Sequence, residues 1–395
     1  MKRQPCQRTV LIILDGVGVG ALADAAAYGD TGADTLRHVA DYCGGLDLPN
    51  LGRLGLGNIA SLAGVAPAAR TTGAYGRMLE ASAGKDSTTG HWEIAGLIQQ
   101  QPFPAYPQGF PAEIITAVSR AIGVEPIGNV AASGTEILLE FGEEHFRSGR
   151  PIVYTSVDSV FQIAAHEEVI SVEELYEICR TVRRLLDPYR ISRVIARPFV
   201  GDTAATFMRT SRRRDFSLPP NGVTLLDKFL AAGLEVSGVG KTSDLFAGRG
   251  IGRFFKSRSN AEGMELTLTA LASMERGLVF TNLVDFDMLY GHRCDAAGFG
   301  QALEAFDRWL PRLLAALRPT DLLIMTADHG CDPTTPGTDH SRESVPLLCW
   351  HPCLAAGTSL GVRQSFTDVA ATIAELYGLS MEHGRSFAAS LYPPA

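Results

Sequence analysis

Short apolar runs alternate with amphipathic stretches along most of this 395-residue chain. The runs are rich in β-branched residues and do not alternate with polar ones, which is typical of strands buried on both faces of a sheet. They lie at residues 10–14, 152–154, 194–196, 278–280, 322–325 and 345–348. Helical spacing of apolar residues follows at 171–186, 300–317 and 367–376, the first opened by the capping pattern of Ser171 and Glu174. This alternation predicts an α/β fold with a largely parallel sheet.

Two breaks in the pattern predict the domain organisation. Residues 99–108 are rich in proline, glutamine and aromatic side chains, and residues 217–222 read SLPPNG. Such segments are typical of crossovers and hinges. The stretch between them has strands and helices of its own. We therefore expect a core domain formed by residues 1–100 and 219–395, with residues 101–218 inserted as a second α/β domain.

Composition excludes several classes of protein. The chain is 46% hydrophobic and 20% charged, which excludes wholesale disorder. Its net charge of −8, from 35 basic and 43 acidic residues, argues against a nucleic-acid or membrane-surface binder. No apolar stretch approaches the roughly 20 residues of a membrane span. A chain of this length folds without a structural metal, so any metal site is expected to be functional.

The cysteines and the first residues indicate a compartment. Seven cysteines are scattered along the chain without a CxxC pair, an odd number that fits a reducing environment better than a disulfide framework. Residues 1–9 are polar and lead directly into an apolar run, which is not the pattern of a signal peptide. These features predict a cytoplasmic protein.

Acidic residues and histidines follow three of the predicted strands. In open parallel sheets, ligands bind beyond the carboxyl ends of the strands, so these side chains are expected to converge. Taken singly, an aspartate at a strand end is usually a helix cap or turn residue, and a lone histidine is usually structural. The candidates are Asp15, Asp287, His292, Asp328, His329 and His340.

Three carboxylates and three imidazoles are more ligands than one tetrahedral ion uses. They suit two divalent ions with mixed oxygen and nitrogen ligands. Two ions would supply four positive charges against three negative ones, and the remaining charge would attract phosphate. The same carboxylates crowded together without metal would repel one another. The pattern therefore predicts a binuclear metal centre.

A second candidate segment reads GKDSTTGHWE at residues 84–93. It places three hydroxyls in a row, those of Ser87, Thr88 and Thr89. Metal coordination lowers the pKa of a hydroxyl and makes it a nucleophile. If a helix begins at Ser87, its amide groups also favour phosphate there. The alternative is a helix cap without chemistry.

These motifs, together with others spread over essentially the whole chain, are similar to those of a known enzyme family. They lie at residues 14–20, 32–35, 48–50, 54–58, 84–93, 132–136, 164–168, 196–201, 284–287, 290–292, 327–330 and 336–340. Together they resemble the prokaryotic-type phosphopentomutase family of the alkaline phosphatase superfamily. The strand-end motifs indicate only the superfamily. The segments GKDSTTGHWE, IAAHEE (163–168) and ARPFVG (196–201) are similar to this family in particular.

The resemblance implies an alkaline-phosphatase-like core with an inserted cap, and two divalent ions, commonly Mn²⁺. One ion would be held by Asp15, Asp328 and His329 with the nucleophile oxygen. The other would be held by Asp287, His292 and His340.

The implied reaction interconverts ribose 1-phosphate and ribose 5-phosphate, or the deoxyribose pair. It proceeds through a phosphoenzyme and a sugar bisphosphate, which also acts as activator. The family's nucleophile is a threonine directly after Gly-Lys-Asp, and here that position is Ser87; Thr88 and Thr89 stay as alternatives. By resemblance, the small-molecule substrate is bound by Ser156, Asp158, Arg193, Arg209 and Lys241.

Two residues beside the expected ligands depart from the family. Cys331 stands where asparagine is usual, and Cys294 stands near His292 where arginine is usual. A thiolate at Cys331 would favour zinc, whereas the simpler interpretation is a small buried thiol.

Three other functions stay open. A metal-dependent phosphomonoesterase or phosphodiesterase would use the same centre, a sister mutase would act on phosphoglycerate, and a metal-binding scaffold would have no activity. The scaffold is disfavoured because all six ligands and the hydroxyl are present.

Overall fold

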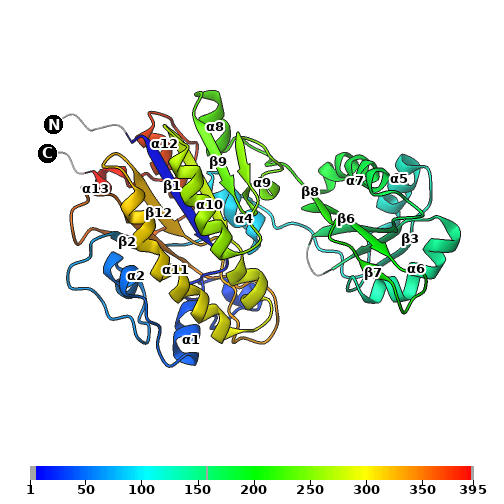
Figure 1. The fold of residues 1–395 in the computed structure, drawn as a ribbon, viewed down its shortest axis with the longest axis horizontal. Coiled ribbons are helices and arrows are strands. Elements are labelled where there is room, and N and C mark those ends of the chain that lie inside the picture. Colours follow the sequence, from blue (N-terminus) through cyan, green and yellow to red (C-terminus); the bar gives the residue numbers. More distant parts are fainter. Residues whose placement is uncertain (1–5, 157–158, 393–395) are drawn as a thin grey trace. The chain divides into compact units, whose positions relative to one another are not determined.

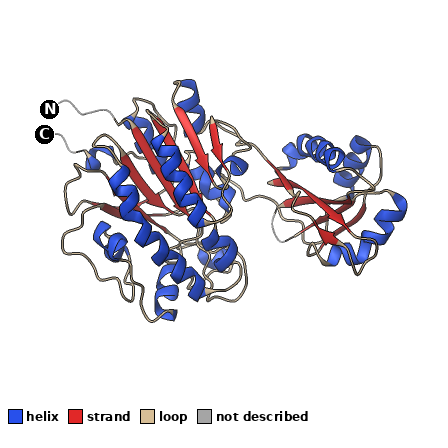
Figure 2. Ribbon diagram, in the orientation of Figure 1, coloured by secondary structure: helices blue, strands red, loops and turns tan. Residues whose placement is uncertain are grey.

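The computed structural model describes residues 6–156 and 159–392, and the chain divides into two compact units (Figure 1). Unit 1 comprises residues 1–102 and 220–395, and unit 2 comprises residues 103–219. Each unit has its own sheet and its own helices (Figure 2). Unit 2 is therefore an insertion in the sequence of unit 1.

Unit 1 is built on an eight-stranded sheet. Only β13 runs antiparallel to the other strands of this sheet, so the predicted α/β fold with a mostly parallel sheet is confirmed. In spatial order the strands are β10 (Arg253–Phe255), β9 (Glu235–Val239), β11 (Gly277–Leu283), β1 (Arg8–Leu14), β12 (Leu322–Thr326), β13 (Val345–Trp350), β2 (Ala74–Met78) and β14 (Ser359–Arg363).

Helices cover this sheet, and α10 and α11 cross the face turned toward the viewer (Figure 1). Every residue of β1, β11 and β12 is buried, which explains the apolar runs at residues 10–14, 278–280 and 322–325 within them. The helices of unit 1 are η1 (Ala25–Tyr28), α1 (Thr35–Tyr42), α2 (Pro49–Leu54), α3 (Leu56–Ile59), α4 (Ser87–Ile94), α8 (Leu225–Ala231), α9 (Thr242–Leu245), α10 (Asn260–Ala272), η3 (Phe286–Gly291), α11 (Ala296–Ala316), α12 (Thr367–Leu376) and α13 (Ala388–Leu391).

Unit 2 has a six-stranded sheet with its own apolar core. The spatial order is β3 (Ile127–Ala131), β4 (Ile152–Thr155), β5 (Val160–His166), β6 (Arg193–Val200) and β7 (Met208–Arg209), and β8 (Arg214–Ser217) also pairs with β6. Its helices are α5 (Ala112–Ile122), α6 (Glu136–Ser148), α7 (Val172–Leu186) and η2 (Asp187–Tyr189). Phe161, Leu175 and Val194 belong to the core between α7 and the sheet.

Within the described residues, no helix has both the length and the apolar character needed to cross a bilayer.

The buried carboxylate of Asp307 on α11 caps a different helix. It accepts hydrogen bonds from the backbone N–H groups of Asn50 (3.1 Å) and Leu51 (2.7 Å) at the start of α2, and from the Asn50 side chain (2.8 Å). Asp307→Asn would replace one carboxylate oxygen by an NH₂ group, which cannot accept hydrogen bonds from the N–H groups of Asn50 and Leu51. We expect a loss of about 1–3 kcal/mol in the free energy of unfolding, measured in urea. The exposed Asp41→Asn should change it by less than about 0.5 kcal/mol, and equal effects would contradict this role.

Candidate metal centre

Three adjacent parallel strands bring the expected carboxylates to one edge of the sheet. The order β11-β1-β12 places the carboxyl ends of these strands side by side. Asp15 directly follows β1, and Asp328 lies two residues beyond β12. Asp287 follows β11 on η3, a short π-helix, a form that often marks functional sites.

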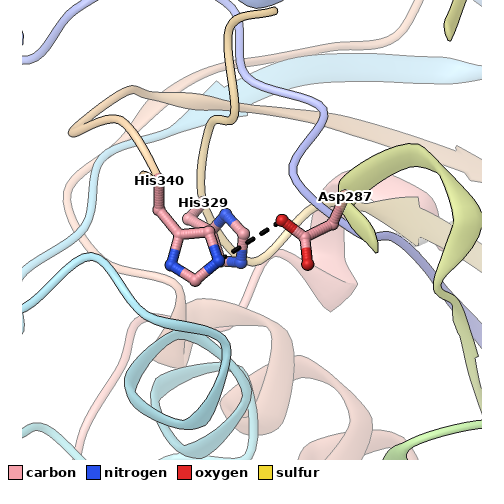
Figure 3. A group of neighbouring side chains, drawn as sticks. All are labelled: Asp287, His329 and His340. Atoms are coloured by element: carbon pink, nitrogen blue, oxygen red, sulfur yellow. Dashed lines mark ion pairs between the residues drawn. The ribbon is translucent and has the colours of Figure 1, made fainter. Parts of the chain in front are cut away.

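The structure brings all six candidate side chains together. His329 Nε2 lies 3.4 Å from Asp15 Oδ1 and 3.4 Å from Asp328 Oδ2. Asp287 Oδ1 lies 3.3 Å from the Nε2 atoms of both His292 and His340. Figure 3 shows Asp287 facing His340 and His329, and the two imidazole rings are 4.0 Å apart between centroids. The two halves of the cluster are thus one continuous group.

The ligand atoms of this cluster fit divalent ions. Four of them are buried without a hydrogen-bond partner: Oδ1 of Asp15, Oδ1 of Asp287, Oδ2 of Asp328 and Nε2 of His340. A buried polar atom that lacks a partner is costly. Oxygen and imidazole donors at these separations supply what a divalent cation requires. The side chains are therefore suited to hold metal.

The electrostatics of the cluster also favour cations. Burial alone would raise the pKa of Asp15 and Asp287, but the nearby Lys241 ammonium and the neighbouring histidines together outweigh burial and hold both pKa values below their usual range. Burial would likewise lower the pKa of His329, yet the surrounding carboxylates, Asp328 first, raise it to about 10. The carboxylates thus create a field strong enough to hold positive charge in a buried place.

Lys241 belongs to this centre rather than to unit 2. Its Nζ lies 3.1 Å from Asp15 Oδ2 and 3.3 Å from Asp287 Oδ2. Burial opposes its charge, but Asp15 and Asp287 raise the pKa of the ammonium above its usual value. Lys241, expected as a substrate contact, is therefore placed where it can reach an anion bound at the centre.

Of the three hydroxyls in the 84–93 segment, that of Ser87 lies beside the cluster. Helix α4 begins at Ser87, and the Asp86 carboxylate caps it by accepting from the N–H groups of Thr88 and Thr89. Ser87 Oγ lies 3.1 Å from His329 Nε2. The Thr89 hydroxyl instead donates to Asp86 at 2.6 Å.

Two residues to which the sequence analysis assigned no role, one of them within the 84–93 segment, complete the arrangement. The Asn282 side-chain amide donates to Asp15 Oδ2 at 3.0 Å and lies 3.2 Å from His91 Nε2. His91 Nδ1 lies 2.8 Å from the Ser87 carbonyl oxygen. A polar chain thus joins the candidate nucleophile to Asp15. The available signals were weak: His91 is one helical turn after Ser87, and Asn282 is a polar residue in a buried strand.

The other expected substrate contacts belong to unit 2. Ser156 follows β4 and is half-buried, and Asp158 lies outside the described residues. Arg193 begins β6, where its guanidinium is 3.6 Å from Asp215. Arg209 in β7 lines a pocket of about 560 Å³ within unit 2.

The two cysteines near the centre differ in exposure. Cys331 is 1% exposed and forms a potential ligand group with Asp287 and His292. Burial, reinforced by Asp287, raises the pKa of its thiol. Cys294 is exposed, and its thiol donates to the carbonyl oxygen of Gly337.

Gly90 lets α4 approach the metal centre. A Cβ at this position would lie 2.1 Å from the carbonyl oxygen of Asp328. In a helix, replacing glycine by alanine normally raises the free energy of unfolding by about 1 kcal/mol. Here the contact with Asp328 should make the same substitution destabilising. We expect Gly90→Ala to lower the free energy of unfolding, measured in urea, by about 1–3 kcal/mol. The substitution should also lower activity because it displaces Ser87. The control is Gly52→Ala on α2, where the new Cβ would meet only Val65, at an ordinary contact distance of 3.5 Å. If both substitutions stabilised the protein, the prediction would be contradicted.

Comparisons with known proteins agree with this geometry. Residues 7–381 match the model of the Metalloenzyme superfamily. Phosphopentomutase of Syntrophotalea carbinolica is 65% identical over 96% of this chain and 97% of its own length. Phosphopentomutase of Caldanaerobacter subterraneus is 55% identical over 96% of this chain and 97% of its own length.

One solved structure shares the fold across its length. The PH0037 protein of Pyrococcus horikoshii is 16% identical, with a TM-score of 0.50 over 97% of this chain and 100% of that one. At this identity the likeness concerns the fold alone. The identities to the two curated relatives, over nearly the full length of each, are high enough to show the family. The chain is a member of the phosphopentomutase family within the metalloenzyme superfamily.

Proposed function

We propose that this chain is a metal-dependent isomerase that interconverts ribose 1-phosphate and ribose 5-phosphate, and the corresponding 2-deoxyribose phosphates. Family membership supports the substrate class. The observation that carries the chemistry is the Ser87 hydroxyl, 3.1 Å from His329 in a cluster of three buried carboxylates. A nucleophilic oxygen beside a cation site is what phosphoryl transfer requires.

The proposal assigns the six ligands to two ions. Asp15, Asp328 and His329 would hold one beside Ser87, and Asp287, His292 and His340 would hold the other. Mn²⁺ is the proposed metal, since oxygen and imidazole donors accept it readily. Bound ions would lower the pKa of the Ser87 hydroxyl and offset charge on a phosphoryl group. The buried atoms without hydrogen-bond partners support this assignment.

Ser87 carries the phosphoryl group between the two positions of the sugar. The phosphorylated enzyme gives this group to the free hydroxyl of a sugar monophosphate, so the Ser87 O–P bond breaks and a sugar bisphosphate forms. Ser87 then accepts the other phosphoryl group of that bisphosphate, and the isomeric monophosphate leaves. A sugar bisphosphate is therefore needed to phosphorylate the resting enzyme.

Unit 2 would act as the cap that retains the bisphosphate and excludes water, because a phosphoenzyme open to water would hydrolyse. In this proposal Ser156, Asp158, Arg193 and Arg209 bind the sugar and its distal phosphate, together with Lys241. Guanidinium groups suit phosphate because they present two parallel donors.

All seven cysteines are described and none is in a disulfide, which supports a cytoplasmic location.

The experiment compares isomerisation with hydrolysis. The Mn²⁺-loaded protein, primed with ribose 1,5-bisphosphate, is given ribose 1-phosphate, and both ribose 5-phosphate and inorganic phosphate are measured. A mutase forms ribose 5-phosphate much faster than it releases phosphate. Release of phosphate at an equal or greater rate would instead identify a phosphomonoesterase and overturn the proposal.

A further inference from the structure

The Cys331 thiol lies within the metal cluster, although nothing in the proposed reaction uses it. Its Sγ, a carboxylate oxygen of Asp287 and a ring nitrogen of His292 all lie within 4.8 Å of one another. Asp287 is 2% exposed, and its Oδ1 has no hydrogen-bond partner. This buried oxygen independently marks the same place as a site for a cation.

The position of the thiol is fixed by packing. A Cβ on Gly291 would lie 2.4 Å from Cys331 Sγ, and a Cβ on Gly16 would lie 2.8 Å from Cys331 Cβ. These glycines adjoin His292 and Asp15, so Cys331 packs against the backbone that carries two candidate ligands. A sulfur atom held in this way needs little reorganisation to bind an ion.

The donor sets of the two proposed ion sites differ in softness. Asp15, Asp328 and His329 offer oxygen and nitrogen atoms, which suit Mn²⁺. The site at Asp287 adds sulfur to oxygen and nitrogen. Sulfur selects Zn²⁺, Co²⁺ and Cd²⁺ over Mn²⁺.

We propose that Cys331 is a ligand of the ion bound at Asp287, His292 and His340, and that this site selects thiophilic ions while the Asp15 site accepts Mn²⁺. As the ion binds, a sulfur–metal bond forms, the S–H bond breaks and the thiol proton passes to solvent. This replaces Mn²⁺ by a thiophilic ion at the Asp287 site and keeps Mn²⁺ at the Asp15 site, so the centre would hold two different metals. This inference depends on the proposed function only because both place an ion at Asp287.

The test is spectroscopic and needs no turnover. Metal-free full-length protein is titrated with Co²⁺, and binding is followed by equilibrium dialysis. The wild type should develop a sulfur-to-cobalt charge-transfer band in the near ultraviolet. Cys331→Ser and Cys331→Asn should lose this band while still binding Co²⁺ through the nitrogen and oxygen donors. Cys294→Ser, which changes an exposed cysteine on a neighbouring loop, should keep it.

Metal affinities provide the second measurement. In Cys331→Ser, we expect the Cd²⁺ affinity to fall by about 10–100-fold and the Mn²⁺ affinity to change by less than about threefold. Co²⁺ binding without the charge-transfer band in the wild type would overturn this inference and leave the proposed function intact. Failure of wild-type protein to bind Co²⁺, Cd²⁺ or Mn²⁺ would overturn both.

Discussion

Ser87→Ala is expected to reduce mutase activity by at least about 10⁴-fold and to abolish the phosphoenzyme. Removing the nucleophile of a covalent mechanism eliminates the step on which every turnover depends, and losses of this size are typical. The geometry singles out Ser87 because its Oγ is 3.1 Å from His329 Nε2. Intact mass analysis after exposure to ribose 1,5-bisphosphate should show one added phosphoryl group in the wild type and none in the variant.

Two substitutions serve as controls for this result. Ser87→Thr keeps a hydroxyl at the same position and should retain the phosphoenzyme. Thr89→Val removes the hydroxyl that donates to Asp86, and should destabilise the start of α4 without preventing phosphorylation. A phosphoryl group found on Thr88 or Thr89 in Ser87→Ala would show that the nucleophile has been misassigned.

Asp328→Asn is expected to lower activity by about 10³-fold or more while leaving the protein folded. Metal ions contribute several kcal/mol of charge stabilisation to phosphoryl transfer, and this substitution removes one anionic ligand of the proposed Asp15 ion site. The fold should survive because the amide oxygen can still accept from the Gly16 N–H, as Asp328 Oδ1 does at 3.2 Å.

Three measurements separate the effects in Asp328→Asn. Dialysis should show weaker Mn²⁺ binding, circular dichroism should match the wild type, and urea unfolding without metal should still give a single cooperative transition. Chelation of the wild type should likewise abolish activity without unfolding it. Unchanged Mn²⁺ binding in Asp328→Asn, or collapse of the wild type on chelation, would contradict the assignment.

The elements encoded by local sequence could be predicted. Helix α7 begins where the Ser171 cap predicts, with the Ser171 side chain accepting from the Glu174 N–H. Helix α12 occupies the predicted residues 367–376. Helix α11 begins at Ala296, four residues before the predicted start. Gly298 and Gly300 weaken the helical pattern there, and the Asp295 cap was not recognised.

Properties that depend on tertiary contacts could not be predicted. An apolar run has no direction, so the antiparallel course of β13 was not visible in residues 345–348. The three aspartates could be found because each follows a strand. Asn282 and His91 could not, because their contact depends on how α4 approaches β11. The place of Lys241 beside Asp15 and Asp287 could not be predicted either, because it depends on β9 lying next to β11 in the sheet.

The position of β1 has a consequence for biosynthesis. This strand is made long before its two neighbours in the sheet, β11 and β12, which come from residues 277–283 and 322–326. Unit 1 therefore cannot pair β1 on both sides until the ribosome has translated β12, whereas unit 2 pairs its strands within residues 127–217. Such distant pairing slows folding and prolongs exposure of an apolar segment. The apolar β1 segment of the nascent chain thus stays without its two sheet neighbours during the interval between translation of β1 and of β12.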